Sequence, residues 1–375
     1  RKLLKEGPEI LNEAINLVET EDAEFVIIPG DLTKDGTQIS HLKFAEHLAQ
    51  IEKSGKEVFV IPGNHDILNP ESYSYQEDRK IKVKNINPDE FRKIYKNYGY
   101  EQALYSDQNS LSYIAEPIEG IWLFAMDACR YNENTEGGHP VTGGKFNDQT
   151  LQWIENMLYL ASKTGKSVIG FMHHGVLEHY QKQSKFFKEY VVEDNKKVSG
   201  LFASYNMKLV FTGHYHAQDI SSKYYQDDKF IFDVQTGSLV TWPCPVRKVS
   251  IENNHAEINS LFITKIPSKP ENFTSFAKDY VWTGIEGIAK STLIEYKLKE
   301  EEAALLSGQI ADAFVAHYQG DEISPEKAFN LKGVSLKGRF LIGFKKKQVW
   351  YLWNDTPPED NFLKIDLGSG QILKN

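Results

Sequence analysis

Short apolar runs alternate with helical patterns through the first 212 residues of the chain. The apolar runs cover residues 25–28, 58–61, 168–172 and 209–212. Runs of this length without polar alternation are typical of strands buried on both faces. Residues 8–19 place apolar side chains at helical spacing, and a second such pattern surrounds Leu151 and Ile154. Buried strands that alternate with helices predict a layered α/β domain.

The pattern changes after residue 228. Residues 229–236 and 246–251 form short alternating runs, which predict antiparallel strands. Pro267 and Pro270 disfavour regular structure, so we place a domain boundary there. The sequence therefore predicts a large domain over residues 1–265 and a smaller α+β domain over residues 266–375.

Three features describe the smaller domain. Apolar residues from Leu306 to His317 share one helical face and predict a helix. Ser324-Pro325-Glu326 combines an N-cap residue, a first-turn proline and a first-turn acid, which predicts the start of another helix. Arg339–Trp353 predicts paired strands around the basic turn Lys345-Lys346-Lys347.

Composition narrows the possible functions. The chain has 375 residues, of which 41% are hydrophobic, enough for a sizeable core. Its formal net charge of −9 argues against a broad electrostatic grip on nucleic acid. Its two cysteines form neither a disulfide framework nor a cysteine-based metal site. No apolar run approaches the roughly 18 residues that a membrane span requires. The sequence does not indicate an oligomeric state.

Metal-binding residue types follow the four apolar runs. Asp31 follows the first run and Asn64-His65-Asp66 follows the second. The last two runs lead to histidines, namely His173, His174, His214 and His216. Because sites in α/β sheets lie outside the carboxyl ends of the strands, we expect these side chains to meet. Imidazole, carboxylate and amide oxygen together suit Zn, Mn or Fe.

The other histidines have simpler interpretations. We expect His41, His47, His139, His255 and His317 to be hydrogen-bonded structural residues. His174 is expected to lie behind the ligands or to pack, and His179, which follows it closely, stays open between a ligand and a structural residue.

The four blocks, in this order, resemble the calcineurin-like metallophosphoesterase superfamily over roughly residues 8–260. The resemblance implies a β-sandwich flanked by helices, with residues 1–265 as the catalytic domain, and two divalent metal ions (Mn, Fe or Zn). Asp31 would bridge the ions, Asn64, His173 and His214 would complete one site, and His216 would bind the other ion. His65 would face the substrate as a catalytic residue, and Asp66 is grouped with it.

Two departures from the family pattern matter. The family begins with a strand carrying Asp-x-His, which supplies two further ligands, and nothing in the 375 residues matches it. We expect this motif to lie upstream, because a sheet without its first central strand would expose a long apolar edge; an impaired first metal site is the alternative. Lys34 stands where the superfamily's protein phosphatases carry a histidine-orienting aspartate, which favours the bacterial phosphodiesterase-like branch.

Further features resemble that branch. Met126-Asp127 at a strand end, Gly143-Gly144, and Gln152-Trp153 on a helix match its strand, loop and helix. The polar loop from Cys129 to Val141 is either an active-site lid or a mobile excursion. Asp127 and Tyr215 are expected to serve turn formation and packing.

The leading hypothesis is dimetal-dependent hydrolysis of a phosphodiester or phosphomonoester by metal-activated water. The alternative is a catalytically impaired metal-binding or interaction protein that retains the fold. A metal-independent hydrolase is a third reading, but no Gly-x-Ser-x-Gly motif or reactive-cysteine context supports it.

The expected substrate is a small-molecule or lipid-headgroup phosphoester, and the resemblance to exported bacterial enzymes favours a periplasmic or envelope location. In the 375 residues, four residues can hold one ion, whereas Asp31 and His216 alone would hold a second ion weakly.

Overall fold

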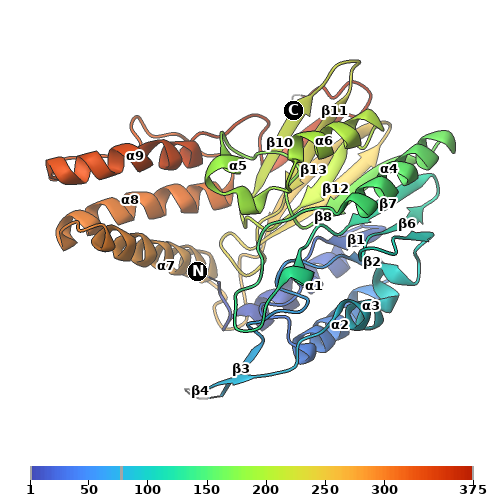
Figure 1. Ribbon diagram of the computed structural model, residues 1–375, viewed down its shortest axis with the longest axis horizontal. Coiled ribbons are helices and arrows are strands. Elements are labelled where there is room, and N and C mark those ends of the chain that lie inside the picture. Colours follow the sequence, from blue (N-terminus) through green and yellow to red (C-terminus); the bar gives the residue numbers. More distant parts are fainter. Residues whose placement is uncertain (1, 77–78, 374–375) are drawn as a thin grey trace.

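A central mixed sheet organises the protein. The structure is a computed structural model that describes residues 2–76 and 79–373. Within these residues, seven strands form one sheet in the order β10-β11-β9-β8-β7-β6-β5 (Figure 1). Their bounds are β5 Tyr105–Ser106, β6 Tyr113–Ile118, β7 Ile121–Met126, β8 Ser167–Met172, β9 Leu209–Thr212, β10 Asp219–Tyr224 and β11 Phe230–Gln235. Strands β7, β8, β9 and β11 run parallel, so the ends of β8 and β9 meet at the same edge.

Side-chain alternation along the central strands separates two layers. On β7, Trp122 and Phe124 pack with helices α4 (Asp148–Lys163) and α6 (Asn195–Ser204). Leu123 and Ala125 face the other way and pack against a second layer of strands. The predicted layered α/β fold is confirmed, because a strand with apolar residues on both faces must be covered on both faces.

The second layer consists of two smaller sheets. Strands β1 (Phe25–Ile28) and β2 (Glu57–Val60) pair in parallel. Strands β12 (Pro245–Glu252), β13 (His255–Phe262) and β14 (Phe362–Asp366) pair antiparallel. The predicted antiparallel strands at 229–236 and 246–251 both exist, as β11 and β12, in different sheets. Strand β11 pairs antiparallel with β10 and in parallel with β9.

Helices cover the outer face of β1 and β2. Apolar residues of α1 (Gly7–Thr20), α2 (Gln38–Lys53) and α3 (Pro88–Ile94) pack there in one cluster. The hairpin of β3 (Tyr73–Gln76) and β4 (Arg79–Lys82) projects from this side (Figure 1). A short helix, α5 (Gln183–Phe186), follows β8.

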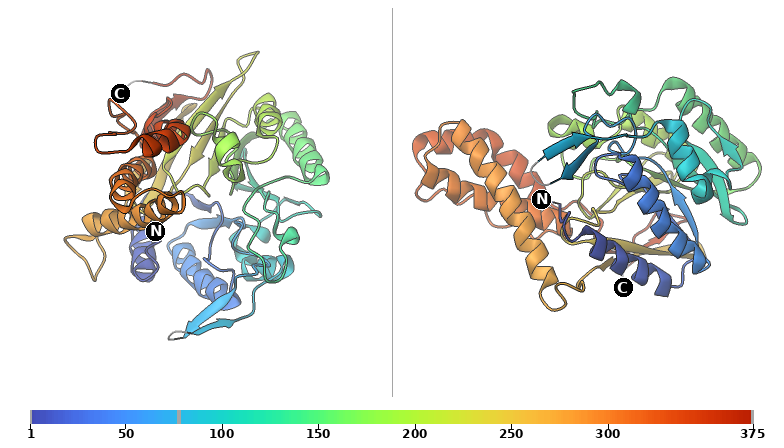
Figure 2. Two further views of the ribbon diagram at one scale, coloured as in Figure 1. Left: turned by 60° about the vertical axis from the view of Figure 1, so that its left-hand side comes forward. Right: turned by 90° about the horizontal axis from the view of Figure 1, so that it is seen from below.

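Three long helices form a unit beside the sandwich. Helices α7 (Phe273–Glu295), α8 (Glu300–Gln319) and α9 (Leu336–Trp353) project to one side in Figure 1 and in the right-hand view of Figure 2. This helical unit begins after the proline pair at residues 267–270, where we predicted a boundary. Its chain then returns to the sandwich, because β14 pairs with β13. The division at residue 265 stays a proposal, with β14 as part of the first unit's sheet. No helix in the described residues is long and apolar enough to cross a membrane.

Two predictions for the helical unit are wrong. Arg339–Trp353 belongs to the single helix α9 rather than to paired strands, because Ile342, Val349 and Leu352 share a helical face that is buried in the unit's core. Lys346 and Lys347 are exposed on this helix, and the side chain of Lys345 lies outside the described residues.

The helix predicted at Ser324-Pro325-Glu326 does not form. The Ser324 hydroxyl donates to the carbonyl of Trp353 instead of capping a helix. The Ser324 side chain, which the local sequence predicts as an N-cap, therefore makes a tertiary hydrogen bond instead.

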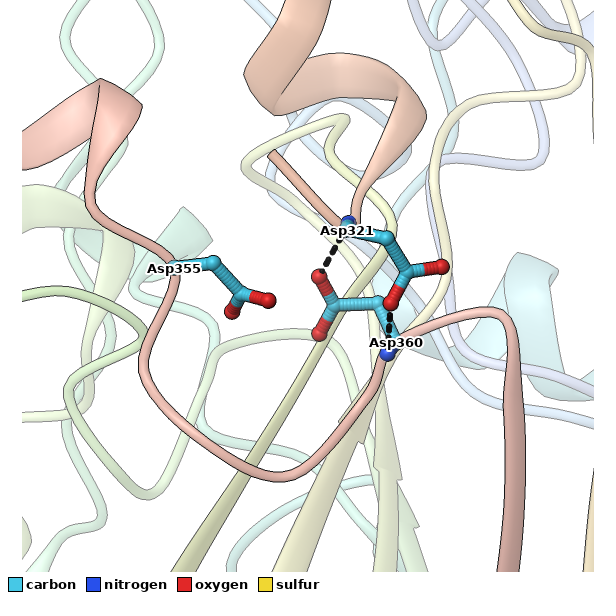
Figure 3. A group of neighbouring side chains, drawn as sticks. All are labelled: Asp321, Asp355 and Asp360. Carbon is cyan, nitrogen blue, oxygen red and sulfur yellow. Dashed lines mark hydrogen bonds between the residues drawn. The ribbon is translucent and has the colours of Figure 1, made fainter. Parts of the chain in front are cut away.

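Three aspartates close the return from the helical unit to the sandwich (Figure 3). Asp360 accepts hydrogen bonds from the backbone amides of Ile220 at 2.7 Å and Asp321 at 2.8 Å. Asp321 in turn accepts one from the amide of Asp360 at 2.6 Å. Asp355 faces this pair, and burial followed by the charge of Glu322 raises its pKa to about 7. These reciprocal hydrogen bonds hold the backbone segments at Asp321 and Asp360 together, which explains why the two side chains lie side by side.

Candidate metal centre

Two glycines bring the loops after β1 and β2 into contact. A Cβ on Gly30 would lie 2.6 Å from the amide nitrogen of Gly63, and a Cβ on Gly63 would lie 2.2 Å from the nitrogen of Asp31. Gly30 also has a φ of 92°, which glycine tolerates best. The two Pro-Gly sequences thus permit a backbone approach that places Asp31 beside the second loop.

Asp66 joins these two loops. Its carboxylate accepts hydrogen bonds from the amides of Leu32 at 3.0 Å, Thr33 at 2.9 Å and Gly63 at 2.8 Å. The side chain is fully buried. Burial and the charge of Asp31 raise its pKa to about 7. Both oxygens are engaged by the loop backbone, which suits a positioning role for Asp66, and the catalytic role in which we grouped it with His65 stays a prediction.

Three acceptor atoms lie close together at Asp31: Nε2 of His173, Oδ1 of Asn64 and Oδ1 of Asp31 itself. The Nδ1–H of His173 donates to the carbonyl of Pro29 at 2.8 Å, which leaves the lone pair of a neutral ring on Nε2. That Nε2 lies 3.2 Å from Oδ1 of Asn64 and 3.5 Å from Oδ1 of Asp31. Asn64 and His173 are 1% and 2% exposed. Three acceptors facing one another in a buried site need a cation among them.

The loop after β9 brings a second pair of histidines to the same place. The His214 ring centroid lies 4.6 Å from that of His173 and 4.5 Å from that of His174. Nε2 of His214 donates to the carbonyl of Glu189 at 3.1 Å, so Nδ1 keeps the lone pair. His214 and His216 both have positive φ values, 71° and 69°, which are uncommon for residues with a side chain.

The protonation states suit metal binding. Burial opposes ionisation of Asp31, but His173 and then His65 hold its pKa well below the usual range. Burial and then the charge of Lys2 lower the pKa of His216 to about 3. Burial also lowers the pKa of His173 and His214. Metal ligands must be deprotonated, and an ionised carboxylate beside neutral imidazoles meets that requirement.

His65 lies next to this group. Its backbone amide donates to Oδ1 of Asp31 at 3.1 Å. Its Nδ1 is buried without a hydrogen-bond partner in the structure. His174 packs behind the group, with Nε2 bonded to the carbonyl of Thr142 at 2.9 Å, and a Cβ on Gly144 would lie 2.4 Å from its ring. Gly144, which we singled out from the sequence, therefore leaves room for His174.

The structure assigns contacts to most other histidines. His41 contacts Tyr95, His139 pairs with Glu71, His255 pairs with Asp366, and His317 pairs with Glu322. His47, whose Nδ1 is buried without a hydrogen-bond partner, is not paired in this way. Asp127 accepts a bond from the amide of Cys129 at 2.9 Å, as expected of a strand-end turn residue.

The donor set fits a divalent metal. We call Asp31, Asn64, His173 and His214 the metal cluster. It offers carboxylate oxygen, amide oxygen and imidazole nitrogen from four loops; the acceptors of Asp31, Asn64 and His173 lie together, and the ring of His214 packs beside them. Such a mixed N/O set suits Mn, Fe or Zn.

A comparison with models of protein families shows the family of the chain. A family model described as calcineurin-like phosphoesterase matches residues 5–218. The chain belongs to the calcineurin-like phosphoesterase family. This membership confirms the resemblance stated above, and it supports metal-dependent phosphoester hydrolysis with two divalent metal ions. All residues of the metal cluster lie within the matched segment.

Other comparisons add little to this assignment. The phosphoesterase chain is similar to a crystal structure of a dimetal phosphatase from Danio rerio, with 15% identity over 68% of this chain and 86% of that chain, and a TM-score of 0.45. No curated protein matches the chain.

Sequence reasoning missed several contributors to the site. The carbonyls of Pro29 and Glu189 orient two histidines, and backbone atoms leave no signal in the sequence. Lys2 lies close enough to influence Asp31 and His216, although nothing in its neighbourhood marks it. Asp233 had a signal, because an acid inside the apolar run Phe230–Val234 is unusual in a buried strand.

Proposed function

We propose that this protein hydrolyses phosphodiesters, with divalent ions held by Asp31, Asn64, His173, His214 and His216. The observation that carries the proposal is that Oδ1 of Asn64 and Oδ1 of Asp31 lie 3.2 Å and 3.5 Å from Nε2 of His173. When bound, such ions supply Lewis-acid charge for the phosphoryl group and a more acidic water. The chain's own residues fix the ligands and move the proton.

In this proposal each residue has a separate task. Asp31 is the only ionised carboxylate of the metal cluster, so it supplies the negative charge that retains the ions. Hydrogen bonds to Pro29 and Glu189 hold His173 and His214 in the ring states that keep Nε2 and Nδ1 free, respectively. His65 is the proton donor for the departing oxygen, because its half-buried side chain lies beside Asp31 at the edge of the metal cluster.

The preference for a diester rests on the loop after Asp31. Position 34 carries a lysine, which donates to Asp35 at 2.7 Å, so this position offers no carboxylate to orient His65. The family's protein phosphatases place an aspartate there, which argues against a phosphoprotein substrate. A small-molecule or lipid-headgroup diester is the proposed class.

The test compares two chromogenic substrates. Chelator-treated protein, reloaded with Mn²⁺, should hydrolyse bis-p-nitrophenyl phosphate faster than p-nitrophenyl phosphate. His255→Ala, a change at a surface pair, serves as the matched histidine control and should retain both activities. Preference for the monoester would contradict the diester assignment, and binding of Mn²⁺ without turnover of either substrate would favour the alternative, a metal-binding protein with impaired catalysis.

A further inference from the structure

A second buried group of histidine and aspartate lies behind the metal cluster. His179 is 1% exposed, and its Nδ1 lies 2.7 Å from Oδ1 of Asp219. Its Nε2 makes an ion-pair contact of 3.3 Å with Oδ2 of Asp233. A carboxylate at each ring nitrogen calls for a proton on each nitrogen. We call these three residues the His179 clamp.

The two aspartates of the clamp occupy neighbouring strands. Asp219 begins β10 and pairs with Gln235, whereas Asp233 on β11 pairs with Ser221. The two are diagonal neighbours, so they point to the same face of the sheet. Burial disfavours a charged ring, but Asp233 and then Asp219 raise the pKa of His179 to about 10. The imidazolium thus compensates two buried carboxylates, which would be costly alone.

Asp233 connects the clamp to both histidine-bearing loops. Its Oδ2 accepts hydrogen bonds from the amides of Val176 at 2.6 Å and Leu177 at 2.9 Å, in the loop that begins with His173. Its Oδ1 accepts one from the hydroxyl of Thr212 at 2.6 Å, at the end of the strand that leads to His214. One carboxylate therefore fixes the spacing of two metal-cluster histidines.

His179 holds this carboxylate in place between the two strands. Without the ring, Asp219 and Asp233 would lie buried on one face of the sheet with no cation between them, and their mutual repulsion would favour a rearrangement that separates them. Movement of Asp233 would weaken its hydrogen bonds to the two amides and the hydroxyl. The loops that carry His173 and His214 would then lose a shared anchor.

We propose that His179 is a positioning residue for the metal centre, acting through Asp233 to set the distance between His173 and His214. This inference rests on the proposed function, in which both histidines bind metal. Nδ1 of His179 is bonded to Asp219 and Nε2 faces Asp233 at 3.3 Å, away from the metal cluster's acceptors, so we assign His179 a positioning role and not a ligand role.

The first experiment measures Mn²⁺ affinity by calorimetry. His179→Gln and Asp233→Asn should each raise the dissociation constant about 10-fold, as changes behind metal ligands commonly do. Leu158→Ala on α4 is the control for lost stability, because it removes buried apolar contacts and no hydrogen bond of the clamp. Its affinity for Mn²⁺ should equal that of the wild type. Unchanged affinity in folded clamp variants would overturn the proposal.

The second experiment observes the ring directly. In ¹⁵N-histidine NMR spectra at about pH 8, the ring of His179 should have both nitrogens protonated. Its signal should vanish in His179→Gln, whereas any such signal from His317, whose pKa burial lowers but Glu322 raises overall, should remain. Absence of such a ring in the wild type would also overturn the proposal. Failure of the proposed function would look different, because the wild-type protein would then bind no Mn²⁺ at all, and the positioning role would fall with it.

Discussion

The metal cluster and the His179 clamp use the same residue types in the same domain but differ in what faces each ring nitrogen. In the clamp, both nitrogens of His179 face carboxylates, Nδ1 in a hydrogen bond to Asp219 and Nε2 in an ion-pair contact with Asp233. In the metal cluster, the proton of His173 points to a backbone carbonyl, and Nε2 faces two further acceptors. The carbonyl of Pro29 accepts the Nδ1 proton of His173 and leaves its Nε2 suited to bind metal. His179 has a carboxylate at each nitrogen instead and is suited to carry a positive charge.

This difference predicts that loss of a side chain weakens metal binding in both groups, but to a different degree and for a different reason. Removing a member of the metal cluster removes a ligand, whereas removing a member of the clamp alters the distance between ligands that remain. The predictions below test that contrast.

The largest effect is expected from the metal cluster. Asn64→Ala should weaken Mn²⁺ binding by more than the 10- to 100-fold typical of changes behind a ligand, since it deletes a donor atom. Metal analysis after dialysis, alongside phosphodiester hydrolysis, measures this. If Asn64→Ala retained the metal as well as His255→Ala does, the cluster would be wrongly assigned.

His65→Ala separates chemistry from metal binding. The variant should keep its metal, because the ring of His65 lies outside the metal cluster, while turnover falls about 10²- to 10⁴-fold through loss of the proton donor. Steady-state kinetics with parallel metal analysis provides the measurement. Release of the metal would make His65 a ligand instead.

The same residues show how far the sequence could lead. Asp31, Asn64, His173 and His214 could be predicted to meet, because each follows a buried strand and strand ends share an edge. The role of His179 could not, since its aspartate partners come from strands whose pairing only the fold defines. Arg339–Trp353 was misread because Lys345-Lys346-Lys347 was taken as a turn between two apolar runs, whereas packing of the apolar face in the helical unit's core favours one continuous helix.

Asp66→Asn tests the positioning role of the aspartate that joins the first two loops. The amide offers one acceptor and places a donor against backbone N–H groups, so we expect destabilisation of about 3 kcal/mol. Urea unfolding measures this loss, and Asp279→Asn on an exposed turn of α7 provides the control. A free energy of unfolding equal to that of the control would contradict the hydrogen bonds described here.

The smallest effect is expected at Asp355, a carboxylate that lies outside the His179 clamp. The pKa of Asp355 rises from 3.8 to about 7 on folding, so its protonated form is favoured in the native state. The associated stability is complete below about pH 4 and is lost as pH rises toward 7. Because the side chain is partly exposed and solvent screens it, Asp355→Asn should stabilise the protein at pH 8 by only about 1 kcal/mol.

That gain should disappear at low pH, where both forms of residue 355 are neutral. Thermal unfolding at both pH values, with Glu359→Gln as the exposed neighbouring control, measures it. An equal shift at the two pH values would show that charge is not the cause.

Anomalous diffraction from crystals grown with Mn²⁺ tests the central claim most directly. We predict the strongest peak at about 2.2 Å from Nε2 of His173, Oδ1 of Asn64 and a carboxylate oxygen of Asp31, with any second ion on the His216 side at lower occupancy. A strongest peak beside His179 or among Asp321, Asp355 and Asp360, with none at His173, would contradict this assignment.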